Sequence, residues 1–377
     1  MKILYLTHTD IENDGRIIKQ IKALSLVKGY FILGYGLKLS NNRLNKVDSP
    51  GIFKIESFKF CSIYNYVPRA IKHAILLFSI TVKYVIKGFV YKPEVVHCHD
   101  TMVLPAGVIL KIICKSKLIY DAHELESQKN SQGIILSRMT YLIELISWRF
   151  VDFFITVSPS IVQWYEEKFG PKRNEIILNS PNYRELDKRK SQNESYFRKM
   201  YAISDEAKIF LYLGIIGKGR GVEMYLNIFE SEGVSSHIVF MGYGDLVEDV
   251  INRSKGCNRI HFHPRVDHER VVEISQSADV GLAIIEDVSL SDYYCLPNKL
   301  FEYAFAGIPI LASDFPDMKC MIDEYKLGAI TKIDYQSVRD SIIRIQELGL
   351  SPSNRDLYPI SWQNQSNKLL NVYKNLQ

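Results

Sequence analysis

Short apolar segments alternate with amphipathic ones along the first half of the chain, and this alternation limits the fold more than any other feature. The apolar segments occupy residues 2–7, 30–35, 95–99, 117–120, 153–157 and 176–178, and helical patterns occupy residues 15–28, 104–114 and 160–169. Consecutive parallel strands need a crossover helix, so strands that alternate with helices favour a parallel sheet covered on both faces. The sequence therefore predicts a Rossmann-like domain.

The second half repeats the same scheme after a polar connector at residues 181–208, which carries a short helical pattern near its end. Strands are predicted at residues 209–213, 236–241, 260–263 and 280–284, and helices at 222–231 and 270–276. We expect domains at residues 1–183 and 184–358, with residues 359–377 forming a final helix that returns to the first domain. Open α/β sheets bind ligands beyond the carboxyl ends of their strands, so we expect the active site in a cleft between the domains.

Composition agrees with a globular protein of two domains. A chain of 377 residues exceeds what one core usually supports, and its hydrophobic and charged fractions, 47% and 24%, are ordinary. The six cysteines include no C-x-x-C pair, which is typical of reduced thiols in a cytoplasm. The longest apolar stretch is too short for a membrane-spanning helix and no signal peptide is recognisable, so we expect a cytoplasmic protein.

Positive charge is concentrated in the first half. Residues 1–183 hold 24 lysines and arginines against 15 acidic residues, a net charge of +9. On a helical projection of residues 69–87, four cations share an arc of roughly 100° with Leu76 and Ile80. These cations are Arg69, Lys72, Lys83 and Lys87. This mixture suits a helix lying on an anionic membrane surface, and it suits equally a core helix whose lysines extend into water.

The stretch from residue 296 to 313, LPNKLFEYAFAGIPILAS, carries the most chemistry. Lys299 and Glu302 are three residues apart and therefore neighbours on one face of a helix. Pro297 suits the first helical turn, and Asn298 is expected close to the cap, so free backbone N–H groups would lie beside the charged pair. The pattern indicates a clamp for an anion and sugar hydroxyls. The alternative is an ordinary surface ion pair.

This stretch resembles the nucleotide-sugar signature of the retaining GT-B glycosyltransferases, the GT4 family. The resemblance implies that Glu302 holds the ribose hydroxyls of a donor nucleotide and that a nearby basic residue meets the diphosphate. The family usually has a second glutamate eight positions earlier, and this chain has Tyr294 there. We expect the donor sugar to be held instead by backbone groups around Tyr294, Cys295 and Leu296, or by His123.

The segment Gly214–Gly221 holds a further basic pair. It is not a P-loop, because no serine or threonine follows Lys218. The GT-B resemblance implies that Arg220 neutralises the leaving diphosphate together with Lys299, with Lys218 as a second candidate. Arg265 is also predicted among the donor-binding residues.

Loops at predicted strand ends supply the other candidates. Gly15 opens the first helix, where the family places a loop over the donor diphosphate, whereas Arg16 next to it could equally lie at the surface. His123 matches a histidine that contacts the donor sugar in the family, the alternative being a histidine with a purely structural role. His99 and Asp100 are predicted on the acceptor side.

Two His-x-His patterns, at residues 97–99 and 261–263, raise the question of a metal. Alternate strand residues share a face, but a metal also needs third and fourth ligands. We therefore predict neither a metal nor a cofactor.

Together these features predict a metal-independent retaining glycosyltransferase of the hexosyltransferase type. It would move a sugar from a nucleotide diphosphate donor, with UDP favoured by family frequency, to a glycan or lipid-linked acceptor in bacterial surface polysaccharide assembly. A nucleic-acid partner is not expected, and a peripheral position on the inner membrane face is one of the two readings of the basic helix. The alternatives are a nucleotide-sugar 2-epimerase and a non-catalytic nucleotide-sugar-binding partner of another transferase.

Overall fold

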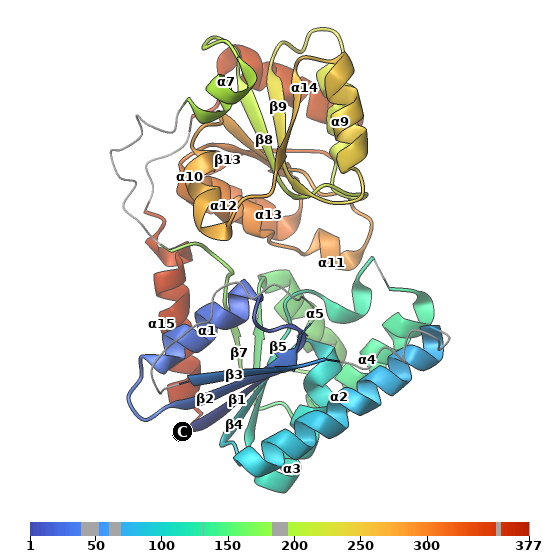
Figure 1. Cartoon of the computed structure of the whole chain (residues 1–377), viewed down its shortest axis with the longest axis vertical. Coiled ribbons are helices and arrows are strands. Elements are labelled where there is room, and N and C mark those ends of the chain that lie inside the picture. Colours follow the sequence, from blue (N-terminus) through green and yellow to red (C-terminus); the bar gives the residue numbers. More distant parts are fainter. Residues whose placement is uncertain (39–52, 60–68, 131, 183–194, 352–355, 377) are drawn as a thin grey trace. The chain divides into compact units, whose positions relative to one another are not determined.

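The chain forms two compact units, which are described separately (Figure 1). The computed structural model describes residues 1–38, 53–59, 69–130, 132–182, 195–351 and 356–376, without the side chains of residues 69–74. The first unit comprises Met1–Leu178 and Ser366–Gln377, and the second comprises Asn179–Gln365.

The first unit is built on a seven-stranded parallel sheet with the strand order β3-β2-β1-β4-β5-β6-β7. The strands are β1 (Lys2–Asp10), β2 (Phe31–Leu37), β3 (Phe53–Phe58), β4 (Val95–His99), β5 (Lys117–Asp121), β6 (Phe153–Thr156) and β7 (Asn174–Ile176). The central strands are buried on both faces, as parallel sheets require. The order reverses between β1 and β4, and ligands of such sheets bind at that point.

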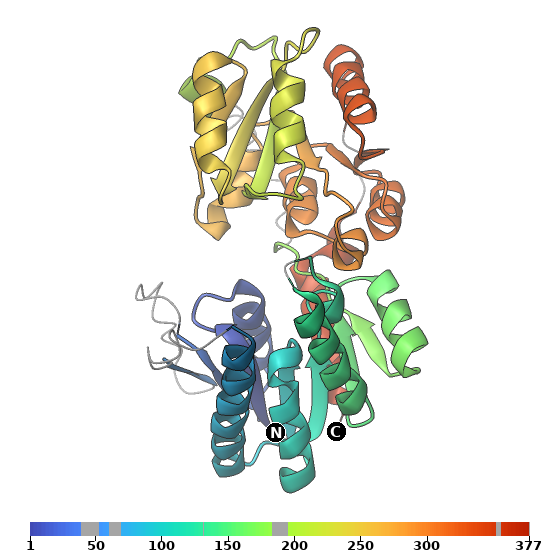
Figure 2. The same ribbon diagram turned by 90° about the vertical axis from the view of Figure 1, so that its right-hand side faces the viewer.

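Helices cover both faces of this sheet (Figures 1 and 2). They are α1 (Gly15–Ser25), α2 (Arg69–Tyr91), α3 (Leu104–Cys114), α4 (Ile134–Trp148), α5 (Pro159–Phe169) and the later part of α15 (Trp362–Lys374), with 3-10 turns at Thr101–Val103 and Glu126–Gln128. Asp14 caps α1, because its carboxylate accepts from the Ile17 amide at 3.1 Å. From α15, the Tyr373 hydroxyl donates to the Tyr5 hydroxyl at 3.1 Å, so the last helix completes this core.

The second unit has a six-stranded parallel sheet with the order β10-β9-β8-β11-β12-β13. The strands are β8 (Ile209–Ile215), β9 (His237–Tyr243), β10 (Ile260–Pro264), β11 (Val280–Ala283), β12 (Ile310–Ser313) and β13 (Gly328–Thr331). Here the order reverses between β8 and β11. At the ends of β8 and β9 the backbones lie so close that a Cβ on Gly242 would meet the Gly214 carbonyl oxygen at 1.8 Å, so this position requires glycine.

Most helices of the second unit contact this sheet. They are α7 (Tyr196–Tyr201), α8 (Val222–Glu230), α9 (Val247–Gly256), α10 (His268–Ser275), α11 (Leu290–Tyr293), α12 (Asn298–Ala306), α13 (Pro316–Tyr325) and α14 (Tyr335–Leu348), with a 3-10 turn at Tyr358–Ile360. Phe229 of α8 packs with Phe210 and Phe240 of the sheet in the core of this unit.

The predicted alternation of strands and helices is confirmed in both units, with most boundaries shifted by one to three residues. The edge strands β3 and β13 and the helices α4, α9, α13 and α14 were not predicted, because their apolar periodicity is short or interrupted. Among the described residues, none of the helices is both long enough and apolar enough to cross a membrane.

The expected arrangement of the basic helix is wrong in one respect. Ile80 is fully buried rather than available to a membrane, whereas Lys83 is exposed and Lys87 is half-buried, and both contact β3. The Lys83 ammonium lies 4.4 Å from the centre of the Phe58 ring, and that of Lys87 lies 2.5 Å from a Glu56 carboxylate oxygen. These contacts agree with the second of the two readings, a core helix whose lysines extend into water. The side chains of Arg69 and Lys72 lie outside the described residues.

Candidate functional site

In the second unit, the strand order reverses between β8 and β11. The loop that follows β8 and the loop that follows β11 are connected there by hydrogen bonds. The Gly221 amide donates to the Glu286 carboxylate at 3.1 Å, and the Glu286 amide donates to the Gly219 carbonyl at 3.2 Å. Gly221 precedes α8 with φ 74°, a conformation that strongly favours glycine. These bonds fix the backbone on either side of Arg220.

Arg220 extends from this loop to a carboxylate that the sequence analysis did not single out. Its Nη1 donates to Asp292 Oδ1 at 3.1 Å. The second carboxylate oxygen accepts from the Ser289 hydroxyl at 2.7 Å, and the Ser289 oxygen accepts from the Asp292 amide at 3.1 Å, which caps α11. About a third of the Arg220 side chain remains exposed (37%), so the guanidinium can still meet a ligand.

Lys299 lies in the first turn of α12 with an unusual environment. Its side chain is buried, and its ammonium nitrogen has no hydrogen-bond partner among the residues that the structure describes. The nitrogen lies 4.1 Å from the centre of the Tyr212 ring. Burial, aided by the positive charge of Arg220, lowers the pKa of Lys299 to about 7. A buried cation without a partner is costly, so an anion that reached this nitrogen would be bound strongly.

Glu302 follows Lys299 on the same face of α12. Its side chain is only 12% exposed, and the His268 Nδ1 lies 3.7 Å from its Oε1. The order of the first turn differs from the expectation: Pro297 is the N-cap and Asn298 is the first helical residue, where it is exposed. Asn298 therefore offers a backbone N–H rather than a capping side chain.

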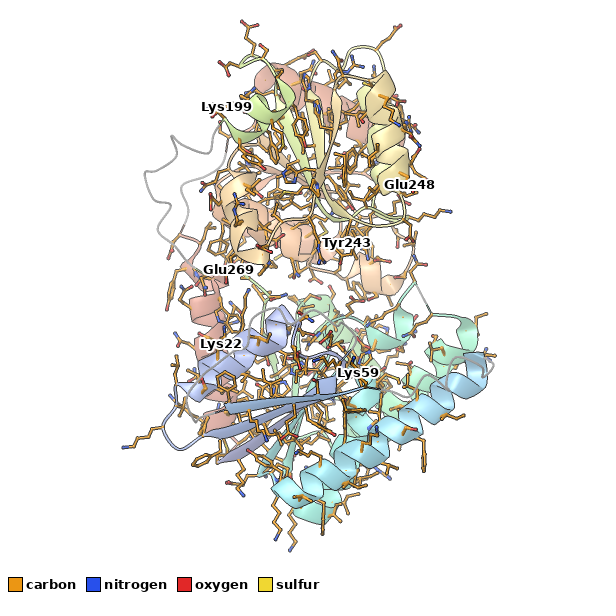
Figure 3. All side chains as sticks on the ribbon, viewed as in Figure 1. Lys22, Lys59, Lys199, Tyr243, Glu248 and Glu269 are labelled. Carbon is orange, nitrogen blue, oxygen red and sulfur yellow. The ribbon has the colours of Figure 1, made fainter. Side chains whose placement is uncertain are left out.

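The remaining donor candidates lie at several places. Tyr294 ends the short helix α11, Cys295 follows it half-buried, and Leu296 packs into the core. Lys218 is exposed in the loop after β8. Arg265 lies beyond β10, with its guanidinium 5.6 Å from the ring of Tyr243 at the end of β9 (Figure 3).

In the first unit, the residues expected near the strand ends form a buried network centred on Asp121. Arg16 donates to Asp121 Oδ1 at 2.9 Å, and Gln20 donates to its Oδ2 at 2.9 Å. Arg16 is 5% exposed, so the surface alternative for this residue is wrong. Burial alone would raise the pKa of Asp121, but Arg16 and His97 outweigh it and hold the pKa well below its usual range. Gly15 is the first residue of α1, which carries Arg16.

Three histidines surround the same carboxylate. His97 and His99 are fully buried on β4 with stacked rings 4.5 Å apart, and the His99 Nδ1 lies 2.9 Å from the His123 Nε2. Burial lowers the pKa of His99 well below its ordinary value. His123 is partly exposed (21%), and its Nδ1 lies 3.7 Å from Asp100 Oδ1. Of the three side chains expected at these strand ends, His99 and Asp100 are buried, whereas His123 is reached by solvent and contacts the His99 ring.

The atoms of His97, His99 and Asp121 lie within 4.8 Å of one another, as metal ligands would. Their other bonds favour a charge network instead. The His97 Nδ1 lies 2.6 Å from the Tyr373 hydroxyl, and Asp121 already holds Arg16. A cation here would meet the guanidinium charge at close range, so we assign no metal to these residues.

Sequence reasoning missed the partners of the predicted residues rather than the residues themselves. Asp292 lies against Arg220, and Tyr212 lies against Lys299. Asp121 lies 3.8 Å from His123, and Gln20 donates a hydrogen bond to Asp121. The available signal was position: Asp121 ends a predicted strand, and Asp292 follows a serine three residues earlier in the pattern of a helix cap.

Comparisons with known proteins agree with this architecture. Residues 207–347 match the family described as glycosyl transferases group 1. An uncharacterized glycosyltransferase of Methanocaldococcus jannaschii is 25% identical over 304 residues, which cover 75% of this chain and 75% of that protein.

Solved structures resemble the whole chain. The sucrose-phosphate synthase of Thermosynechococcus elongatus has a TM-score of 0.72 at 14% identity, covering 100% of this chain and 96% of that one. Anabaena HepE in complex with UDP-glucose has a TM-score of 0.71 at 13% identity, covering both chains completely. WaaG, a glycosyltransferase involved in lipopolysaccharide biosynthesis, has a TM-score of 0.65 at 12% identity, covering 97% of this chain and 99% of that one. The predicted fold of two Rossmann-like domains is therefore confirmed, and it matches the fold of solved GT-B glycosyltransferases.

Proposed function

We propose that this protein is a retaining glycosyltransferase that moves a sugar from a UDP-sugar to a glycan or lipid-linked acceptor. The observation that carries the proposal is the buried ammonium of Lys299, which lies at a helix N-terminus beside Arg220 and has no hydrogen-bond partner among the described residues. A buried cation without a partner is unfavourable, and proteins retain one at sites where a bound ligand supplies the missing partner. A diphosphate supplies the charge and the oxygen acceptors that this position lacks.

Three groups of the second unit fit the parts of such a donor. Lys299 and Arg220 would hold the diphosphate, the arginine through two parallel hydrogen bonds. Glu302, one turn further along α12, would accept hydrogen bonds from the ribose hydroxyls. Anabaena HepE, which has the same fold, has been solved with UDP-glucose, and this supports UDP as the nucleotide.

The proposed chemistry rests on charge stabilisation. Cleavage of the sugar–phosphate bond leaves negative charge on the diphosphate, and fixed cations aimed at that charge lower the barrier. Arg220 would exchange its present bond to Asp292 for one to the phosphate. We further propose retention at the anomeric carbon, with a leaving phosphate oxygen accepting the proton of the acceptor hydroxyl, in line with the GT-B resemblance.

Residues of the first unit would serve the sugar and the acceptor. His123 is the exposed member of the network that includes His99, Asp100 and Asp121, and its ring is oriented by contacts on both nitrogens. We propose that it contacts the transferred sugar. A lipid-linked acceptor in surface polysaccharide assembly would place the enzyme on the inner face of the cell membrane.

Thermal-shift titration with UDP, UDP-glucose, GDP and inorganic phosphate tests the donor site. We expect UDP and UDP-glucose to stabilise the wild type, since a ligand that binds only the folded state stabilises it by an amount that grows with the logarithm of the ligand concentration above Kd. Glu302→Gln should weaken the binding of nucleoside diphosphates about tenfold or more, because hydrogen bonds to a charged group are lost. It should leave the binding of inorganic phosphate unchanged. Lys299→Met should weaken the binding of nucleoside diphosphates and of inorganic phosphate alike.

Matched controls come from the same unit. Glu248, which projects from α9, and Lys199 on α7 are exposed (Figure 3), so Glu248→Gln and Lys199→Met should leave UDP binding unchanged. Equal binding of UDP by wild type and Lys299→Met would overturn the proposed donor site.

Product analysis separates transfer from the alternatives. A C2-epimerised sugar formed from donor alone would identify a 2-epimerase. A chain that binds UDP but neither hydrolyses nor transfers the donor with any lipid or glycan acceptor would be a non-catalytic partner, which Tyr294 in the place of a glutamate favours.

A further inference from the structure

Three helices of the first unit, α2, α3 and α4, lie side by side over one face of the sheet (Figure 2). Their outward side chains are unusually apolar. On α2 the exposed residues include Phe78, Val82, Ile86, Phe89 and Val90, which span an arc of about 120° on a helical projection. This arc is opposite the buried side chains of the same helix, so it faces away from the core.

The next helix, α3, repeats the pattern. Its exposed residues are Ile109, Ile112 and Ile113, and the exposed cations Lys115 and Lys117 follow the helix. The helix packs tightly on α2: a Cβ on Gly88 would meet Leu110 at 2.4 Å. The outward side chains of the two helices therefore belong to one surface.

The third helix, α4, is the most distinctive. From its first residue to the residue after its end, every exposed side chain is an isoleucine, a leucine or an arginine. The apolar ones include Ile134 and Ile135, which are 74% and 71% exposed, and Ile146. Arg138 and Arg149 lie within the same arc.

Acidic groups are absent from the outside of these helices. Their combined sequence holds one acidic residue, Glu144, which is fully buried and accepts hydrogen bonds from the Tyr120 and Tyr165 hydroxyls. Exposed apolar surface of this extent marks an interaction site. Here the exposed charged side chains that the three helices themselves carry are all positive.

We propose that the exposed face of α2, α3 and α4 docks on an anionic lipid bilayer. Isoleucine, leucine and phenylalanine side chains would enter the boundary between headgroups and acyl chains, while arginine and lysine groups pair with lipid phosphates. This face differs from the basic arc of α2 that the sequence analysis predicted, because that arc packs against β3.

The charges on this face favour a lipid bilayer over a second copy of the protein as its partner. A symmetric contact between two copies would bring the same face against itself, placing Arg138 and Arg149 near their own equivalents with no exposed carboxylate on these helices to pair them. An anionic bilayer satisfies both the apolar and the cationic groups.

Vesicle flotation of the full chain tests the proposal, which does not depend on the donor site. We expect flotation with vesicles of phosphatidylcholine and phosphatidylglycerol, and little with phosphatidylcholine alone. Arg138→Gln/Arg149→Gln should weaken partitioning roughly 30-fold, taking about 1 kcal/mol for each cation near the surface. Ile135→Ser/Ile146→Ser should weaken it at least about tenfold.

A matched double variant on α7 of the second unit, Lys199→Gln/Met200→Ser, removes one exposed cation and one exposed apolar side chain and should float like the wild type. All variants should keep the thermal shift with UDP, which separates loss of docking from loss of folding or of the donor site. Equal flotation with neutral vesicles, or undiminished flotation of both α4 variants, would overturn the proposal. So would a dimer, detected by light scattering, that the α4 variants dissociate in the absence of vesicle binding.

Discussion

The ammonium nitrogen of Lys299 lies 4.1 Å from the centre of the Tyr212 ring, within the range of a cation–π contact. The face of the ring attracts the charge but offers no oxygen that could accept a hydrogen bond. The three N–H groups of the ammonium therefore stay without an acceptor. Lys299 is thus held in place by an aromatic face while its hydrogen-bonding capacity is kept for a ligand.

This relationship predicts that donor affinity depends on pH. Only the protonated lysine attracts a phosphate, and the pKa of Lys299 in the ligand-free protein is lowered to about 7. Affinity for UDP-glucose, whose diphosphate does not titrate near neutrality, should fall by up to about tenfold per pH unit above pH 7. Calorimetry in buffers of different ionisation enthalpy should show uptake of a proton on binding. A flat pH profile in the wild type would contradict this role.

The same burial predicts a gain in stability when the charge is removed. Because the pKa of Lys299 is lowered, the unfolded state binds more protons than the folded state between about pH 7 and pH 10.5, and stability should rise with pH across that window. Lys299→Met should raise the unfolding free energy of the ligand-free chain at neutral pH by on the order of 1–3 kcal/mol. Urea unfolding measures this, with Lys199→Met as the neutral control.

The ion pair between Arg16 and Asp121 predicts the opposite outcome in the first unit. Asp121→Asn would leave the buried guanidinium without its carboxylate, which usually costs about 3–5 kcal/mol. We expect a matching drop in the urea midpoint of the first unit. An Arg16→Met/Asp121→Asn double variant should recover part of the loss, since it removes the unpaired charge.

The buried histidines predict that the protein loses stability already at a pH above the range in which carboxylates titrate. Burial lowers the pKa of His97 and His99, so below about pH 6.5 the unfolded state binds protons that the folded state does not, and stability should fall. The urea midpoint should therefore be lower at pH 5.5 than at pH 7.5. His99→Asn should flatten this dependence, whereas the exposed His268→Asn should preserve it.

The loop at α11 predicts contrasting effects of two neighbouring substitutions. Tyr294→Phe should leave donor use nearly unchanged if backbone groups hold the sugar. Asp292→Asn should weaken the bond that Arg220 would exchange for one to the phosphate, so it should raise the affinity for UDP-glucose by about tenfold. Steady-state kinetics on both variants distinguishes the two positions.

The sequence was sufficient for features carried by short segments. The strands β4 and β11 and the helices α3 and α12 follow from local periodicity, and Lys299 and Glu302 follow from their three-residue spacing. Position within one helix is enough to place such side chains together.

Relationships between distant segments could not be predicted in this way. Asp292 meets Arg220 from 72 positions along the chain, and Asp121 meets Arg16 from 105 positions. Such pairs require the strand order of the sheet. The outward face of α2 was equally hidden, because a helix that is apolar on most sides does not reveal which side is buried.

The bond network around Tyr373 sets an order on the synthesis of this protein. The Tyr373 hydroxyl lies 2.6 Å from the His97 Nδ1 and donates to the Tyr5 hydroxyl. A ribosome must therefore complete the entire second unit before α15 can close the core of the unit it began with. Until then, the sheet of the first unit lacks one of its covering helices while the rest of the chain is synthesised. Chaperones that bind nascent chains therefore have more time to bind the first unit than the second.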